Sequence, residues 1–264
     1  MLRSLAKAVY YPLYRTGVRA QCLGHRIRDA AARREGPLPP PELRFRVAGD
    51  PAAERFIRVG RETVSNLEAC LKATGRSIDS FESVLDFGAG CGRTLIPLSR
   101  QLPGSRIHGV DTDREAIEWC ARNLLQVDAR PNPAEPPLPF DTDSFDLIYA
   151  VSVFTHLGPD MEAAWLAELR RVLSPGGVAL LTVYSRESVD GAGELEEVER
   201  KGIVFRESRK LEGFFPQWYQ TCFRSEAYTR ERFGQYFDNV EYLRRGLGDL
   251  DCVVCQTQGS VSPA

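Results

Sequence analysis

The sequence predicts an α/β fold built on a mainly parallel sheet, and three observations carry this prediction. First, the short apolar run Ser83–Phe87 is followed by Gly88, Gly90 and Gly92 and then by a helix-like segment. A strand, a glycine-rich turn and a helix form the opening of a nucleotide-binding α/β unit. Second, further apolar runs alternate with segments of helical periodicity. Third, 264 residues with 43% hydrophobic composition suit one large α/β domain with extensions.

The spacing of the glycines indicates which nucleotide this turn accommodates. The dinucleotide pattern places its third glycine three residues after the second, whereas these glycines are two residues apart and Arg93 follows them. Asp86 lies at the mouth of the turn, where a carboxylate would repel a pyrophosphate on the helix N-terminus. The turn therefore favours a cationic ligand such as S-adenosylmethionine, which has an ammonium and a sulfonium but no phosphate.

The stretch from Val84 to Gly92 resembles the first motif of the class I S-adenosylmethionine-dependent methyltransferases, typically V-L-D-x-G-x-G-x-G. Residues 144–157 and the L-x-P-G-G turn that ends at Gly177 resemble two further motifs of this family, so the resemblance covers residues 55 to 257. It implies a Rossmann-like sheet of seven strands, helices on both faces, an antiparallel last strand and S-adenosylmethionine as the cofactor. The residues expected at the cofactor turn are Asp86, Gly88, Ala89, Gly90 and Gly92.

Composition and charge narrow the class of protein. The net charge of −2 provides no overall field for nucleic acid, so we expect no nucleic-acid partner. Seven cysteines in a long chain argue against a disulfide framework. Cys252 and Cys255 lie in a strand-like run without a second pair, so we interpret them as packing residues and expect no metal. Without an apolar run of 18 residues or a secretory pattern, we expect a cytoplasmic protein, and the excess of arginine over lysine is typical of a bacterial source.

Residues 1–35 carry eight basic residues and an apolar pattern at helical spacing. Such a helix can lie on a membrane surface or dock on a partner protein, or it can pack on its own domain or on a second subunit. We favour packing, because Pro12 and Gly17 interrupt the pattern. The proline-rich run that ends at residue 41 is predicted to be a stiff linker. We therefore divide the chain into an extension (1–41) and a methyltransferase domain (42–264).

The domain is predicted to begin with an extended piece over residues 45–49, followed by a helix that Asp50 caps and Pro51 opens. In the family that this chain resembles, a helix before the first strand covers the methionine end of the cofactor. Arg58 and Arg61 on this helix are candidates to bind the methionine carboxylate, and a solvated arginine face is the alternative for each.

The second strand is predicted over Arg106–Asp111 and ends in an acid. An acid at this place can accept hydrogen bonds from both ribose hydroxyls, and the family has its ribose-binding acid here. We assign this role to Asp111, with Thr112 beside it. Asp113 is predicted to cap the following helix rather than to contact the cofactor.

The third strand has a weaker signal, and we place it over Leu124–Asp128. Two residues, Asp128 and Asn132, compete for the contact with adenine. We prefer Asn132, because an amide can both donate to and accept from adenine and because residues 135–140 resemble the stretch that follows this contact in the family.

The fourth strand is predicted over Phe145–Val151, beside the first. Its carboxyl end faces the glycine turn at a switch point of the sheet, so Val151 and Ser152 are expected to line the cofactor. His156 follows closely and is the candidate general base, with a structural role in the loop as the alternative. Thr155 is a candidate to fix the substrate.

After a helix over Glu162–Val172 and a turn, a fifth strand is predicted over Val178–Val183. Residues 186–225 then form an insert, which in this family tends to be a substrate lid. The closing elements are a helix over 228–237 and a strand pair, 240–243 with 252–256. The aromatic residues of the insert that we expect at the acceptor are Phe215, Trp218 and Tyr219.

The main hypothesis is a methyltransferase that acts on a hydroxyl of a sugar, a polysaccharide unit or a secondary metabolite. The motif style resembles bacterial methyltransferases of glycan and natural-product pathways. A second hypothesis keeps the cofactor and moves the methyl group to nitrogen on an amine or a protein. A third is a non-catalytic, cofactor-binding scaffold, and an NAD-dependent enzyme is the rival at the level of the fold. A homo-oligomer is compatible with each of them.

Overall fold

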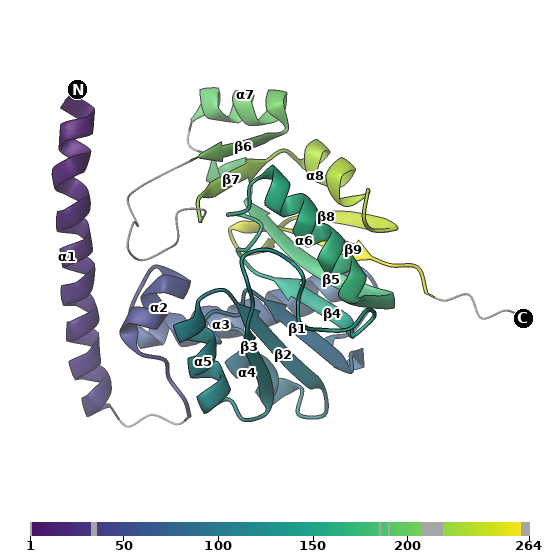
Figure 1. The fold of residues 1–264 in the computed structure, drawn as a ribbon, viewed down its shortest axis with the longest axis horizontal. Coiled ribbons are helices and arrows are strands. Elements are labelled where there is room, and N and C mark those ends of the chain that lie inside the picture. The colour runs from purple at the N-terminus through teal and green to yellow at the C-terminus, as the bar shows by residue number, and fades with distance from the viewer. Residues whose placement is uncertain (1, 33–35, 185, 190, 207–218, 260–264) are drawn as a thin grey trace, which may run out of the picture.

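A seven-stranded sheet forms the centre of the computed structural model (Figure 1). The structure describes residues 2–32, 36–184, 186–189, 191–206 and 219–259, with side chains from residue 11 onward. The strand order is β3-β2-β1-β4-β5-β9-β8, and the first five strands in this order are parallel while β9 is antiparallel to both β5 and β8. This topology confirms the Rossmann-like fold with an antiparallel last strand. The strands are β1 (Ser83–Phe87), β2 (Arg106–Asp111), β3 (Val127–Pro131), β4 (Phe145–Ala150), β5 (Leu173–Tyr184), β8 (Asn239–Leu247) and β9 (Leu250–Gln256).

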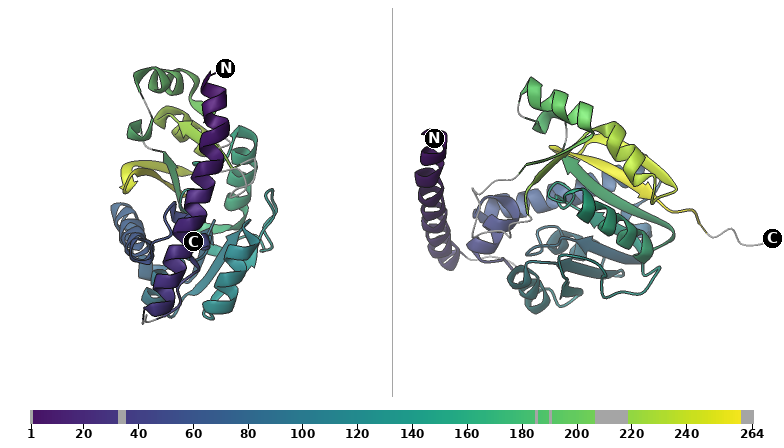
Figure 2. Two further views of the ribbon diagram at one scale, coloured as in Figure 1. Left: turned by 90° about the vertical axis from the view of Figure 1, so that its left-hand side faces the viewer. Right: turned by 45° about the horizontal axis from the view of Figure 1, so that its top comes forward.

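Helices cover both faces of the sheet (Figures 1 and 2). One core contains residues of α3 (Ala53–Ala73), α4 (Leu95–Gln101) and α5 (Arg114–Asn123), and the other contains residues of α6 (Pro159–Val172) and the end of α8 (Glu226–Phe233). Every residue of β1 is buried, because side chains alternate between two covered faces. The continuous apolar run of β1 is thus explained by its central place in a parallel sheet.

Several local predictions are wrong. Helix α3 begins at Ala53 with Ala52 as its N-cap, so Asp50 does not cap it and Pro51 does not open it. Residues 45–49 are not extended: α2 (Pro41–Ala48) occupies this stretch, with a proline at its start and Gly49 at φ 67° as its C-cap. The third strand begins at Val127 rather than Leu124, because Leu124 closes α5 with its N–H on the Cys120 carbonyl. The strand then pairs with β2 over Val127–Pro131.

The N-terminal helix α1 (Leu2–Ala31) runs without a break through Pro12 and Gly17, contrary to the interruption we expected. Val18 and Cys22 of α1 pack against Phe45 of α2, so one face of α1 lies against α2. No helix within the described residues is both long enough and apolar enough to cross a membrane.

The insert after β5 contains α7 (Ala192–Lys201) and the two-stranded sheet of β6 (Ile203–Arg206) and β7 (Thr221–Arg224). A fully buried ion pair between Arg224 and Glu162 ties β7 to α6. The short 3-10 turns are η1 (Ile78–Ser80) and η2 (Arg186–Ser188). Phe215 and Trp218, expected at the acceptor, lie outside the described residues.

Candidate active site

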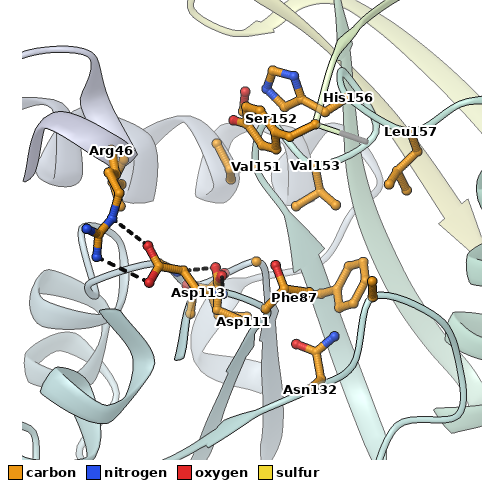
Figure 3. Close-up of a pocket in the computed structure, with 18 of the residues that line it drawn as sticks. Arg46, Phe87, Asp111, Asp113, Asn132, Val151, Ser152, Val153, His156 and Leu157 are labelled. Carbon is orange, nitrogen blue, oxygen red and sulfur yellow. Dashed lines mark hydrogen bonds and ion pairs between the residues drawn. The ribbon is translucent and has the colours of Figure 1, made fainter. Parts of the chain in front are cut away.

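A cavity of about 580 Å³ lies at the carboxyl ends of β1, β2 and β4, under α2 (Figure 3). This is the switch point of the sheet, because β2 continues from β1 to one side and β4 lies on the other. The volume falls in the range of small-molecule sites, about 300–1,000 Å³. The expected residues that line it are Asp86, Gly88, Ala89, Gly90, Asp111, Thr112, Asn132, Val151, Ser152, His156 and Tyr219.

The glycine turn brings backbone to the cavity where no side chain would fit. Gly88 and Gly90 have φ of 87° and 54°, and a Cβ on Gly88 would lie 2.3 Å from Val153 Cγ2. A Cβ on Gly90 would lie 2.5 Å from Val47 Cγ2. Gly92 also has positive φ but packs against Cys120 and Leu124 and does not line the cavity, so its place is structural.

Asp111 is held rigidly at the end of β2. Its two carboxylate oxygens accept hydrogen bonds from the N–H groups of Gly90 (2.6 Å) and Asp113 (2.7 Å). Burial raises its pKa to about 6, and the two N–H donors oppose this rise. Each oxygen retains acceptor capacity toward the cavity, which is what two ribose hydroxyls require.

Asp86 has a different electrostatic state from the one that its sequence position suggested. The carboxyl is buried, and burial, together with the charge of Asp111, raises its pKa to about 8. Below that pH the ligand-free protein therefore holds Asp86 as the neutral acid, and the turn is less negative than expected. A cation that binds here has to displace the proton.

Asn132, rather than Asp128, lies in the cavity. Its Nδ2 donates to the Pro133 carbonyl at 2.7 Å, while its buried Oδ1 has no hydrogen-bond partner within the described part of the chain. An unsatisfied buried acceptor on a residue that lines a cavity indicates a place for a ligand donor. Asp128 instead pairs with Arg130 on the surface of β3.

Helix α2 supplies residues that sequence reasoning missed. Arg46 lines the cavity and forms ion pairs with Asp113 (2.7 Å) and Glu115 (2.8 Å), which fix α2 over the end of β2 (Figure 3). The Val47 carbonyl accepts a hydrogen bond from Arg93. Pro41 and Gly49 at the two ends of α2 are helix-boundary residues that could have predicted it.

Arg93, which follows the glycine turn, lines the cavity, whereas Arg61 does not. The buried Nε of Arg93 has no partner among the residues that the structure describes. Arg61 lines a second, smaller cavity on the other side of Arg93. Arg58 pairs with Glu62 on the exposed face of α3 at 2.8 Å. Helical spacing placed Arg58 and Arg61 on the same helix, but it could not reveal that Arg93, rather than either of them, lines the cavity.

The loop after β4 forms the opposite wall from Asn132 (Figure 3). Ser152 has φ of 61°, its N–H donates to Thr182 Oγ1 at 2.7 Å, and its hydroxyl lies 3.1 Å from that of Thr155. A non-glycine residue in this conformation is held by its surroundings, as is common beside functional sites. Thr155 itself is fully buried and does not line the cavity, so it supports the loop.

His156 is fixed in one tautomer. Its Nδ1 lies 2.6 Å from the Gln220 carbonyl, which only accepts, so Nδ1 carries the proton and Nε2 is bare. The ring stacks on Tyr219 with centroids 3.8 Å apart. Burial lowers the pKa of His156 to about 4, so the ring is neutral at pH 7.

Comparison with known proteins assigns the domain. Residues 84–177 match the family described as methyltransferase domain. The chain is 32% identical over 146 residues to phthiotriol/phenolphthiotriol dimycocerosates methyltransferase 1 of Mycobacterium ulcerans, an overlap of 54% of this chain and 49% of that protein. It is 32% identical over 134 residues to ribosomal protein L11 methyltransferase of Thermus thermophilus, 47% of this chain and 49% of that protein. Residues 84–177 of the chain thus carry a methyltransferase domain, and the chain has the fold of the S-adenosylmethionine-dependent methyltransferases. It spans about half the length of these curated relatives.

Solved structures agree with this methyltransferase fold. An S-adenosylmethionine-dependent methyltransferase of Mesorhizobium loti superposes with a TM-score of 0.52 at 13% identity, over 71% of this chain and 96% of that one. Human N-acetylserotonin methyltransferase, in complex with S-adenosylmethionine, gives 0.51 at 16% identity, over 90% of this chain and 67% of that one.

The described residues of the methyltransferase domain fit its cofactor. The turn at Gly88 and Gly90 leaves room for a ligand against the backbone, and Asp111 offers two acceptors for ribose. The orphaned Asn132 Oδ1 suits the exocyclic amine of adenine. Phe87 and Trp165, with ring centroids 4.6 Å apart, add an apolar wall beside it.

Proposed function

We propose that the protein transfers the methyl group of S-adenosylmethionine to a hydroxyl of a small-molecule acceptor, such as a sugar or a secondary metabolite. The observation that carries this proposal is the neutral His156 ring with a bare Nε2 in the wall of the cavity, on the side away from Asn132. A hydroxyl acceptor has to lose a proton during the reaction, and this nitrogen can take it.

Four groups in the cavity wall would hold the cofactor. Asp111 would bind the ribose hydroxyls, Asn132 the adenine, and Asp86 with the glycine turn the methionine ammonium. Arg93 would pair with the methionine carboxylate, because its side chain lines the cavity and its buried Nε has no partner among the described residues. When bound, the sulfonium supplies an activated methyl group.

The protein then has to align the acceptor with the methyl group and remove the proton of the acceptor hydroxyl. When an acceptor oxygen is held about 3–3.5 Å from the methyl carbon, positioning alone can lower the activation barrier by about 7–11 kcal/mol. With a pKa of about 4, His156 is too weak a base to ionise an alcohol beforehand. The hydroxyl proton becomes strongly acidic only as the new C–O bond forms, so His156 receives it in the same step.

The comparisons support the cofactor more than the acceptor. Relatives are named for acceptors as different as phthiotriol dimycocerosates, ribosomal protein L11 and tRNA cytidine. The small-molecule proposal therefore rests on the size of the cavity, about 580 Å³, and on the His156–Tyr219 stack in its wall. Tyr184 lies behind this stack, with its ring centroid 6.4 Å from that of His156.

The test has two parts. Calorimetry with S-adenosylmethionine and its demethylated product measures cofactor binding, and mass spectrometry then screens sugars, phenols and amines for the gain of one methylene. We expect His156→Gln to lower turnover of a hydroxyl acceptor by about a hundred-fold while cofactor affinity stays unchanged. His25→Gln, on α1, is the matched control. Unchanged turnover in His156→Gln would show that His156 is not the base. If only amines gained a methyl group, the acceptor would be nitrogen rather than oxygen. If the cofactor bound but no acceptor in the panel were methylated, the protein would be a non-catalytic scaffold.

A further inference from the structure

Helix α1 has a second apolar face, which the domain does not cover. Leu13, Leu23 and Ile27 are exposed at 66%, 59% and 66%, although they are large hydrophobic residues. At about 100° per residue, they share one side of the helix with Ala20 and lie away from Val18, which packs on α2. Figure 2 (left) shows α1 in front of the domain with its outer side uncovered by any other described element.

Basic residues border this outer apolar face on both sides. By helical spacing Arg19 and Arg26 lie along one edge and Arg28 along the other, and all three are exposed. Arg26 also reaches Glu42 of α2 at 2.8 Å. The acidic residue of α1, Asp29, turns to the packed side and binds the guanidinium of Arg44 at 2.6 Å. The outer half of α1 therefore combines an apolar stripe with positive edges.

We propose that α1 docks the protein on a bilayer surface that carries anionic lipid headgroups. An apolar stripe with arginine on its borders can insert its leucine and isoleucine side chains at the acyl boundary while the guanidinium groups reach phosphate oxygens. A second copy of the chain suits this face less well, because pairing two such helices sets arginine edges against each other without an acidic partner on that face. The inference depends on α1 alone and is independent of the proposed reaction.

The test is co-sedimentation of the full chain with vesicles of phosphatidylcholine alone and of phosphatidylcholine with phosphatidylglycerol. We expect binding to the anionic vesicles, a decrease with added salt, and little binding to the neutral vesicles. The double variant Leu23→Glu/Ile27→Glu and the double variant Arg19→Glu/Arg28→Glu should each lower the partition coefficient about ten-fold or more.

Single-site controls make the same type of substitution outside α1. Leu125→Glu alters a residue that is 89% exposed beside β3, and Arg106→Glu alters an exposed residue at the start of β2. Both should bind vesicles as the unmodified chain does, and thermal unfolding followed by circular dichroism checks that every variant is folded. Absence of binding to anionic vesicles, or binding that the α1 variants leave unchanged, would overturn the proposal. A dimer in sedimentation equilibrium that Leu23→Glu/Ile27→Glu abolishes would overturn it in favour of a second copy.

Discussion

The two ends of the cavity are built in different ways. The cofactor end consists of the glycine turn and of buried groups on β1 and β2, held by backbone hydrogen bonds such as those to Asp111. The proposed acceptor end consists of the loop after β4 and of β7 with Gln220 before it. Arg224 of β7 donates to the Leu157 carbonyl, and the Gln220 carbonyl fixes His156. Backbone geometry of the sheet governs the first end, and side-chain packing from a distant insert governs the second. Substitutions should therefore separate binding from turnover.

The largest effect is expected at the glycine turn. Gly88→Ala should weaken S-adenosylmethionine binding about a hundred-fold or more, which corresponds to about 2.7 kcal/mol, because the new Cβ meets Val153 and φ is 87°. Calorimetry measures the affinity. Gly75→Ala is the matched control, since Gly75 has φ of 75° but open space around it and no place in the cavity. It should lose about 1 kcal/mol of stability and keep its affinity. Equal affinity in both variants would mean that the turn does not contact the cofactor.

A ten-fold effect is expected at the end of β2. Asp111→Ala removes both acceptors for ribose and should lower the affinity for S-adenosylmethionine by ten-fold or more, which corresponds to about 1.4 kcal/mol of binding free energy. Asp128→Ala, on the neighbouring strand but outside the cavity, should leave the affinity unchanged. If isothermal titration gave the same affinity for Asp111→Ala as for the unmodified protein, the ribose assignment would fail.

The cofactor end was also the more predictable end, for a physical reason. The strand and the three glycines are neighbours in sequence, so local propensity and spacing suffice to place them, and Asp111 ends the next predicted strand, where the family that the chain resembles has its ribose-binding acid. Arg46 and Arg93 were not predicted to line the cavity, because their position depends on how α2 folds back over β2, which is a feature of the tertiary structure. His156 was found by its spacing after β4, but its tautomer depends on Gln220, 64 residues away. The pKa of Asp86 follows from burial between neighbouring strands, which a sequence motif does not state.

The raised pKa of Asp86 gives the cofactor end a pH dependence. Because the free protein holds a neutral Asp86 below about pH 8, a cationic ligand must release that proton. Affinity should therefore rise with pH, by up to about ten-fold per unit below pH 8, and level off above it. Titrations in two buffers of different ionisation enthalpy would detect the released proton.

The same group also makes stability fall with pH, since the unfolded chain loses this proton near pH 3.8 and the folded protein only near pH 8. Asp86→Asn should remove the dependence of affinity and stability on pH between about 6 and 8, where Asp111, with a pKa of about 6, is already ionised. It should also gain about 2 kcal/mol or more of ligand-free stability at pH 8 and bind the cofactor more weakly. Denaturant unfolding across the pH range measures this. A stability profile of Asp86→Asn parallel to that of the unmodified protein would show that Asp86 is already ionised.

The smallest effect is expected at the adenine wall. Asn132→Ala removes the orphaned Oδ1, and one neutral hydrogen bond is worth about 1 kcal/mol, so S-adenosylmethionine should bind about five-fold more weakly. Asn132→Asp keeps an acceptor and should bind more tightly than Asn132→Ala. A cofactor analogue without the exocyclic amine should bind the unmodified protein and Asn132→Ala alike, because the donor is then missing from the ligand. The ratio of the affinities for cofactor and analogue could instead be as large in Asn132→Ala as in the unmodified chain. The amide would then not be the group that binds the adenine, and cofactor binding would depend on the turn and Asp111 alone.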